Sequence, residues 1–141
     1  MTLQARAKLV RESWALIMGL EVEVSAAFYE RFFALAPERA ALFANVDMIA
    51  QRLKFAEMIT DIVRYAERPD GLYPDLRALA DRHVDYQVAA SDYTVAGEAL
   101  LFALGRVMGE RFTPAVREAW AEAYAGTAQV MLRRHQKSGG G

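Results

Sequence analysis

Side chains that bind metals through nitrogen or sulfur are scarce in this sequence. The chain has 141 residues, two histidines (His83 and His135) and no cysteine. The absence of thiols excludes disulfides, iron–sulfur clusters, thiolate zinc sites and cysteine nucleophiles. The two histidines are 52 positions apart, which excludes a zinc motif with both histidines on successive turns of one helix. One inward-facing histidine could not hold a bare metal ion through side-chain nitrogens alone.

His83 is the better placed of the two histidines. It completes an apolar stripe with Leu72, Leu76 and Leu79, at spacings of 4, 3 and 4. We therefore expect its imidazole to face the interior. Such a histidine is most often a packed core residue that is bonded to a carbonyl oxygen. It is also sufficient for haem, because the macrocycle supplies four iron ligands and the protein needs to add only one axial nitrogen.

Two polar side chains interrupt apolar helix faces. Tyr29 stands among phenylalanines, and Gln51 lies on the inward stripe of its helix, one turn before Phe55. A buried phenol or amide without a partner costs about 1–3 kcal/mol. One interpretation is that the two groups bond to each other or serve a ligand in an apolar pocket. The other is structural, with Tyr29 bonded to a helix carbonyl and Gln51 at the surface.

Apolar residues recur at intervals of three and four along the chain, which predicts an all-α protein of six or seven packed helices. No sustained alternation of period two occurs. Helices of unequal length indicate packing at steep angles, unlike an up-and-down bundle. The expected inward positions are Val10, Trp14 and Ile17; Val24, Phe28, Phe32 and Leu35, with Tyr29 and Phe33 on a neighbouring face; Met48, Gln51, Phe55, Ile59 and Ile62; Ala96, Leu100, Leu104 and Val107; and Val116, Trp120, Ala123, Thr127, Val130 and Met131.

Prolines and capping side chains indicate where the helices begin and end. Pro37 is expected to begin a short helix that ends at Phe43. The expected caps of later helices are Asn45 or Asp47, Ser91 or Asp92, and Thr113 followed by Pro114. Residues 68–71 are expected to break the helix before them, and the last helix is expected to fray after Arg134.

The length is that of one domain of ordinary size, and the net charge is close to zero. We expect a single domain over residues 1–137 and a flexible tail over residues 138–141. Lysine and arginine total 17 and aspartate and glutamate total 18, and the resulting formal charge of −1 argues against a nucleic-acid partner. No segment has the apolar run of a signal peptide or a membrane span, so we expect a cytoplasmic protein with no membrane contact.

Several short segments together resemble a known family. They are Phe28-Tyr29-Glu30-Arg31-Phe32-Phe33, Ala36-Pro37-Glu38, Leu42-Phe43, Gln51-Arg52, Arg82-His83, Tyr86-Gln87-Val88, Tyr93-Thr94-Val95-Ala96-Gly97-Glu98-Ala99-Leu100-Leu101, Ala119-Trp120 and Ala123-Tyr124. In this order and spacing, from about Ala7 to Leu132, the chain resembles globins, specifically the single-domain haemoglobins and flavohaemoglobin haem domains of bacteria. The resemblance implies a globin fold around a pocket for haem b, iron protoporphyrin IX.

The resemblance also implies roles for individual residues. His83 would be the proximal iron ligand, and Tyr29 and Gln51 would donate hydrogen bonds to a gas on the distal side. The residues expected to touch the haem are Phe43, Lys54, Phe55, Leu79, Val88, Tyr93 and Ala96, with Lys54 or Arg52 near a propionate. If Ala50 rather than Gln51 faced the ligand, Lys54 would enter the pocket. Burying that unpaired ammonium is costly, which favours Gln51.

Three functions are compatible with these residues. The resemblance implies reversible binding of oxygen or another diatomic gas, such as nitric oxide or carbon monoxide, for storage, delivery or scavenging. An alternative is a nitric-oxide dioxygenase or peroxidase-like enzyme that uses a separate reductase. A third hypothesis is a cofactor-free helical interaction module in which Tyr29, Gln51 and His83 only pack.

Two features weaken the enzymatic alternative. Flavohaemoglobins place the proximal histidine in a network with a tyrosine and a glutamate. Tyr93 matches the tyrosine, but His135 stands at the position aligned with the glutamate. A neutral histidine makes the proximal imidazole less basic than a carboxylate does. The sequence also lacks the flavin and nicotinamide reductase part.

Overall fold

The structure is a computed structural model that describes residues 2–41, 47–67 and 90–139. These residues form six α-helices and one 3-10 turn, with no strand among them. The elements are α1 (Leu3–Ile17), α2 (Glu21–Leu35), α3 (Pro37–Ala40), α4 (Met48–Glu67), α6 (Ala90–Met108), η2 (Gly109–Arg111) and α7 (Pro114–Gly139). The prediction of an all-α protein is therefore confirmed. None of the described helices is long and apolar enough to cross a membrane.

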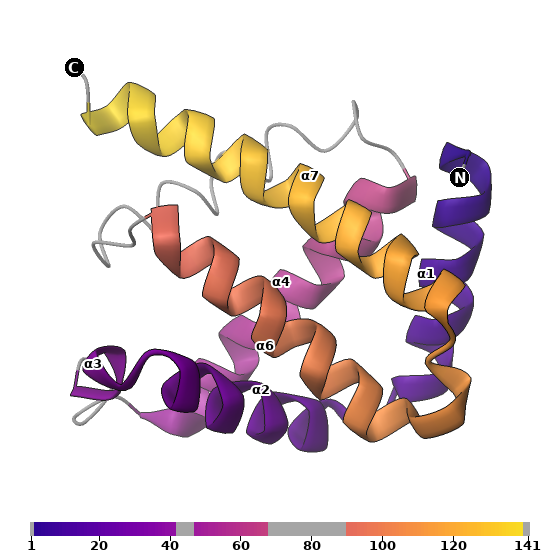
Figure 1. Ribbon diagram of the computed structural model, residues 1–141, viewed down its shortest axis with the longest axis horizontal. Coiled ribbons are helices and arrows are strands. Elements are labelled where there is room, and N and C mark those ends of the chain that lie inside the picture. Colours follow the sequence, from indigo (N-terminus) through magenta and orange to yellow (C-terminus); the bar gives the residue numbers. More distant parts are fainter. Residues whose placement is uncertain (1, 42–46, 68–89, 140–141) are drawn as a thin grey trace.

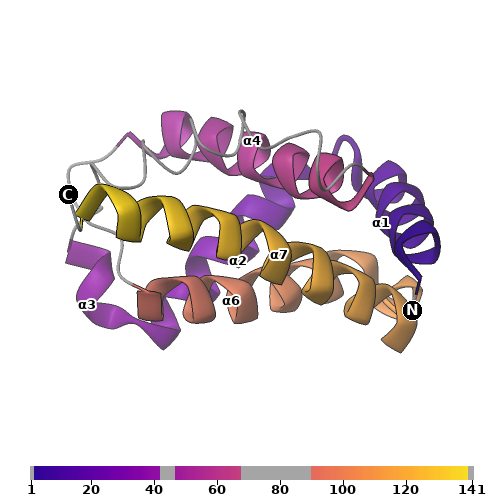
Figure 2. The same ribbon diagram turned by 90° about the horizontal axis from the view of Figure 1, so that it is seen from above.

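α1 and α2 run at a steep angle to each other, whereas α6 and α7 run side by side (Figure 1). α2 packs mainly against α6, and α1 packs against both α4 and α7, so the first and last helices of the chain are neighbours. α7 also contacts α6 and α4, which lie on opposite sides of it when the molecule is seen from above (Figure 2). The resulting arrangement brings together α2, α4 and α6, which carry those expected site residues that the structure describes.

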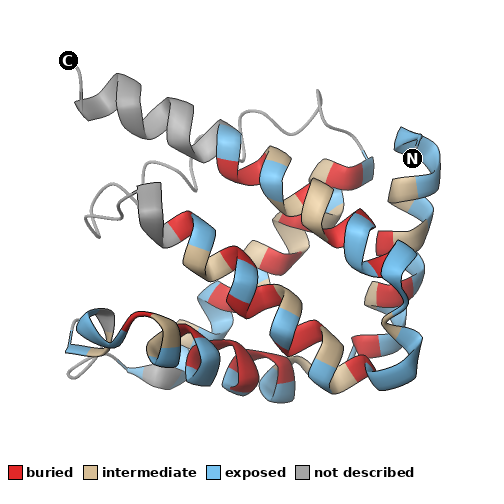
Figure 3. Cartoon of the chain, viewed as in Figure 1, coloured by how far each residue is buried: buried red, intermediate tan, exposed pale blue. Residues whose placement is uncertain are grey.

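The buried residues lie on the helix faces that meet one another (Figure 3). Almost all of the buried side chains are apolar. Every expected inward position whose side chain the structure describes is buried or half-buried. The helical periodicity therefore predicted the inward faces correctly. Leu72, Leu76 and Leu79, the stripe expected to end at His83, lie outside the described residues.

One buried hydrogen bond joins the first and last helices. Trp120 Nε1 of α7 donates to Ser13 Oγ of α1 at 2.7 Å, and Ser13 Oγ lies 2.7 Å from the carbonyl oxygen of Leu9. The Trp120 side chain is fully buried, so this bond satisfies an indole N–H that would otherwise be costly to bury. Periodicity did not indicate the pairing, because the two residues are 107 positions apart.

Two of the expected capping side chains are confirmed. Asp47 Oδ1 accepts the N–H of Ile49 at 2.9 Å at the beginning of α4. Thr113 Oγ1 accepts the N–H of Val116 at 3.2 Å at the beginning of α7. The first backbone N–H groups of a helix have no carbonyl acceptor within that helix. Each capping oxygen therefore accepts a hydrogen bond that one of these N–H groups would otherwise lack.

Of two further predicted boundaries, one lies outside the described residues and the other differs in the structure. α3 is a single turn over Pro37–Ala40, and Phe43 lies outside the described residues. α6 is already helical at Ala90, so the prediction of a cap at Ser91 or Asp92 is wrong. Ser91 and Asp92 lie in the first turn of α6. Polar residues are also tolerated there, because the backbone N–H groups of a first turn have no acceptor within the helix.

The last helix continues beyond the predicted end. α7 reaches Gly139, so the prediction that it frays after Arg134 is wrong. Helical hydrogen bonds are local, and residues 135–138 contain neither proline nor glycine, so the helix continues past the end of its apolar stripe. Of the expected tail, Ser138 and Gly139 are therefore helical, and residues 140–141 lie outside the described residues.

Candidate functional site

Three aromatic rings meet between α2 and the N-terminal half of α4. The rings of Phe28 and Tyr29 are 5.0 Å apart at an interplanar angle of 82°. Phe55 lies 4.8 Å from Phe28 and 6.1 Å from Tyr29. Only 6%, 8% and 3% of Phe28, Tyr29 and Phe55 are exposed. Two helices thus combine to make an apolar wall that contains one hydroxyl group.

The Tyr29 hydroxyl is directed at the beginning of α4. Its oxygen lies 3.5 Å from the main-chain oxygen of Gln51, a long contact for an O–H···O hydrogen bond. Burial raises the pKa of the Tyr29 phenol, and hydrogen bonding to the Gln51 side chain opposes this shift. The phenol therefore remains a neutral hydrogen-bond donor at physiological pH.

The beginning of α4 has the register favoured by the sequence. Gln51 is half-buried, whereas Ala50 and Lys54 are both exposed. Tyr29 and Gln51 are therefore brought together, and the ammonium group of Lys54 stays at the surface. Both interpretations of this pair hold in part, because Tyr29 does contact a helix carbonyl, yet Gln51 is not at the surface.

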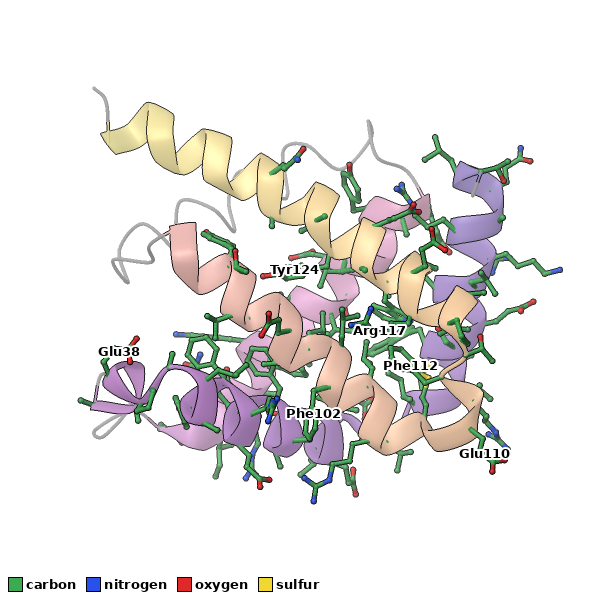
Figure 4. The ribbon with its side chains drawn as sticks, in the orientation of Figure 1. Glu38, Phe102, Glu110, Phe112, Arg117 and Tyr124 are labelled. Atoms are coloured by element: carbon green, nitrogen blue, oxygen red, sulfur yellow. The ribbon has the colours of Figure 1, made fainter. Side chains whose placement is uncertain are left out.

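Tyr93 and Ala96 lie on the first turns of α6, where Tyr93 is 6% exposed and Ala96 is half-buried. Tyr124 of α7, seen between the two helices in Figure 4, donates its hydroxyl proton to the Tyr93 carbonyl oxygen at 2.6 Å. Its ring covers Gly97, where an added Cβ would lie 2.7 Å from Tyr124 Cε1. Glycine at position 97 therefore permits α7 to approach this turn of α6.

The Tyr124 phenol is held in its neutral form. Burial, and secondarily the neighbouring Tyr93, raise its pKa well above the ordinary value of 10.0. The neutral phenol can keep donating to the Tyr93 carbonyl over the whole physiological pH range. Sequence reasoning did not select Tyr124 for this role, although its position four residues after Trp120 places both residues on one side of their helix.

The remaining expected site residues are Phe43, Leu79, His83 and Val88, and all of them lie outside the described residues. Within the described part of the chain, no group of three or more His, Asp or Glu side chains could hold a metal ion. The structure thus brings together Tyr29, Gln51 and Phe55 and places Tyr93 and Ala96 at the start of α6. Phe28, the residue at the centre of the ring contacts, was expected only as a core position.

Comparison with known proteins gives the family. The model of the family described as Globin matches residues 26–131, which include most of α2, all of α3, α4 and α6, and most of α7. The chain belongs to the globin family. The resemblance inferred from the sequence motifs is confirmed, and the all-helical architecture is that of a globin.

Relatives of this globin include longer proteins. The chain is 31% identical over 129 residues to a protein named flavohemoprotein from Rhodopirellula baltica, in a match that covers 90% of this chain and 32% of the relative. A second protein named flavohemoprotein, from Deinococcus radiodurans, is 29% identical over 111 residues, which are 77% of this chain and 28% of that relative. The chain therefore spans about a third of the length of these relatives.

Proposed function

We propose that this globin binds haem b and, through it, reversibly binds oxygen or another diatomic gas. His83 would hold the haem iron from one side, while Tyr29 and Gln51 would donate hydrogen bonds to the gas on the other. When bound, the haem would supply the metal position at which the gas attaches. The observation that carries the proposal is the Tyr29 hydroxyl, which is buried within an aromatic wall and lies beside Gln51.

The described residues fit this group. A haem needs a large apolar slot with few polar groups, and the rings of Phe28, Tyr29 and Phe55 provide one wall with a single phenol in it. We place Phe43, Leu79, Val88, Tyr93 and Ala96 around the rest of the haem. The exposed Lys54 ammonium is suited to pair with a propionate at the rim, since a haem carries its carboxylates at one edge.

The distal donors make the site selective for polarised gases. Oxygen held in this site draws electron density and carries partial negative charge, whereas carbon monoxide is much less polarised. Donors aimed at a developing charge act strongly in an apolar, water-poor environment. The neutral phenol of Tyr29 and the amide of Gln51 are therefore expected to slow the release of oxygen more than that of carbon monoxide.

A second candidate function is enzymatic. The likeness to two proteins named flavohemoprotein favours oxidation of a gas, with nitric oxide converted to nitrate by oxygen and electrons from a separate reductase. The same donors would serve this activity by retaining oxygen until nitric oxide arrives. Nitrate formation that depends on an added reductase would support this candidate, and its absence would leave reversible binding.

The proposal is tested by adding haem to the purified chain. We expect one haem per chain, a Soret band, and spectra of the reduced protein that change reversibly with oxygen and with carbon monoxide. Stopped-flow displacement of oxygen by carbon monoxide then gives the oxygen release rate. If no haem stays with the chain through gel filtration, so that its fractions carry no Soret band, the cofactor-free interaction module would be supported instead.

A further inference from the structure

The outward face of α6 carries a phenylalanine between two opposite charges. Glu98, Phe102 and Arg106 follow one another at intervals of four residues, so they form one stripe along the helix, and all three are exposed. Phe102 remains 42% exposed, and its ring projects beside α2 (Figure 4). The opposite face of α6 carries Leu100 and Leu104, which are fully buried. The stripe thus lies on the solvent side of the helix.

The Phe102 ring is in contact with a cation from α2. The Cζ atom of Arg31 lies 4.8 Å from the ring centroid, which is close enough for a cation–π interaction. Aromatic and arginine side chains are the residue types that most often supply the binding energy at the centre of protein–protein interfaces. A single exposed phenylalanine is common on monomeric proteins. The inference of an interface therefore depends on the charges that accompany the ring.

The charges on this face balance one another. Nη1 of Arg106 lies 3.5 Å from Oε2 of Glu30, and these side chains are 58% and 71% exposed. Ion pairs that are this exposed contribute little to stability, so Arg106 can exchange its partner at small cost. The charged residues of the face are Glu30, Arg31, Glu98 and Arg106. Their two negative and two positive charges sum to zero, so two copies of the face do not repel each other through net charge.

The order of the charges makes the stripe complementary to itself. A two-fold axis that passes through Phe102 at right angles to α6 pairs this helix with the same helix of a second copy in antiparallel orientation. A rise of about 1.5 Å per residue places Glu98 about 6 Å before Phe102 and Arg106 about 6 Å after it. With the two phenylalanine rings in contact at the axis, Glu98 of each copy therefore meets Arg106 of the other.

We propose that the face of α6 formed by Glu98, Phe102 and Arg106 binds a second copy of this chain as an antiparallel helix pair. The contact covers about two and a half turns of α6 on each copy. It is therefore weak compared with interfaces that bury about 800 Å² on each partner. The proposal is independent of haem and gas binding, because none of the three residues belongs to the candidate gas site.

Sedimentation velocity of the purified chain, from about 1 μM to about 1 mM, tests the association. We expect a reversible dimer with a Kd of about 10–100 μM. Phe102→Ala should raise this Kd about tenfold or more, because the ring lies at the centre of the contact. A wild type that stays monomeric up to about 1 mM would overturn the proposal and leave the stripe to a different protein partner.

Charge reversal tests the pairing itself. Glu98→Arg brings arginines together at both ends of the contact, and Arg106→Glu brings glutamates together, so each variant alone should raise the Kd about tenfold. An equimolar mixture of the two variants should restore the dimer to nearly wild-type strength. In the mixed dimer the new arginine of one chain meets the new glutamate of the other, and the unchanged Arg106 meets the unchanged Glu98.

Two exposed residues on other helices provide matched controls. Glu12→Arg on α1 and Arg64→Glu on α4 change the net charge by the same amounts. Neither control, alone or mixed, should change the Kd by more than about twofold. If the controls weaken the dimer as much as the α6 variants do, net charge governs the association and the proposal is overturned. A mixture of Glu98→Arg and Arg106→Glu that associates no better than its components would also overturn the antiparallel pairing.

Discussion

At the scale of single residues, the proposed gas binding depends most directly on the Tyr29 hydroxyl. We expect Tyr29→Phe to speed oxygen release about tenfold to hundredfold, because a hydrogen bond to a charged acceptor is worth roughly 1.5–3 kcal/mol. The ring is retained, so packing against Phe28 and Phe55 is preserved. Stopped-flow displacement of oxygen by carbon monoxide measures the rate.

Carbon monoxide serves as the internal control for this prediction. Its release should change much less than that of oxygen in Tyr29→Phe, and Gln51→Leu should act in the same direction as Tyr29→Phe. Unchanged oxygen release would mean that Tyr29 only packs. Slower release would mean that Tyr29 draws the Gln51 amide away from the gas, since the Tyr29 phenol already hydrogen-bonds to the Gln51 side chain.

The second residue prediction concerns the proposed iron ligand. His83→Ala should abolish stable haem retention, because the only other histidine in the sequence is His135, at the far end of the chain on the last helix. Haem content after gel filtration, read from the Soret band, measures this. A His83→Ala protein with full haem content and an unchanged spectrum of its reduced form would refute the assignment.

At the scale of helices, close approach of α7 to α6 depends on Gly97. We expect Gly97→Ala to destabilise the fold by about 1–3 kcal/mol, although alanine normally favours a helix, because the new Cβ meets the Tyr124 ring at 2.7 Å. That ring cannot shift freely, since its hydroxyl is bonded to the Tyr93 carbonyl oxygen. Urea unfolding followed by circular dichroism gives the free energy of unfolding.

A double variant separates the steric cause from the loss of backbone freedom. In a Tyr124→Leu background the ring is absent, so Gly97→Ala should become neutral or stabilise the protein by up to about 1 kcal/mol. If Gly97→Ala costs the same free energy in both backgrounds, the Tyr124 ring is not what requires glycine at this position.

The same helix contact predicts how stability depends on pH. Because burial raises the pKa of Tyr124 above its ordinary value of 10.0, the folded chain keeps a proton that the unfolded chain loses as pH rises above 10. The stabilisation is fully present below pH 10 and declines above it, by about 1.4 kcal/mol per pH unit. Tyr124→Phe should make this decline shallower in urea unfolding measured on both sides of that pH. An unchanged slope would refute the assignment.

The sequence predicted the helices better than it predicted the contacts between them. Periodicity identified inward faces because every turn of a helix repeats the same geometry, and local capping oxygens marked the beginnings of α4 and α7. The Ser13–Trp120 bond and the fit of Tyr124 on Gly97 could not be predicted in this way. They depend on how separate helices cross, which no pattern within one helix records.

For the candidate site, the sequence predicted which residues at the beginning of α4 face inward. A buried ammonium would have been costly, and the structure accordingly leaves Lys54 exposed and Gln51 half-buried. The sequence did not indicate that the carbonyl in contact with Tyr29 would be that of Gln51. Which carbonyl the Tyr29 hydroxyl reaches depends on the distance between α2 and α4. The central position of Phe28 has the same origin, since its ring contacts both helices.

At the scale of the whole molecule, the proposed haem would add to the core that the crossing helices form. Ligand binding to the folded state alone adds RT ln(1 + [L]/Kd) to stability, which is about 4 kcal/mol at a thousandfold excess over Kd. We therefore expect the haem-loaded chain to melt about 10 °C or more above the haem-free chain. Thermal unfolding followed by circular dichroism, at fixed chain concentration, measures the difference.

His83→Ala distinguishes specific binding from general adhesion of haem to apolar surface. If His83 holds the iron, added haem should raise the melting temperature of the wild type and leave that of His83→Ala almost unchanged. The wall of Phe28, Tyr29 and Phe55 would still be present in the variant, so residual stabilisation would measure apolar contact alone. Equal melting temperatures of the wild type with and without haem would contradict haem binding itself, because no ligand that binds only the folded state can leave stability unchanged.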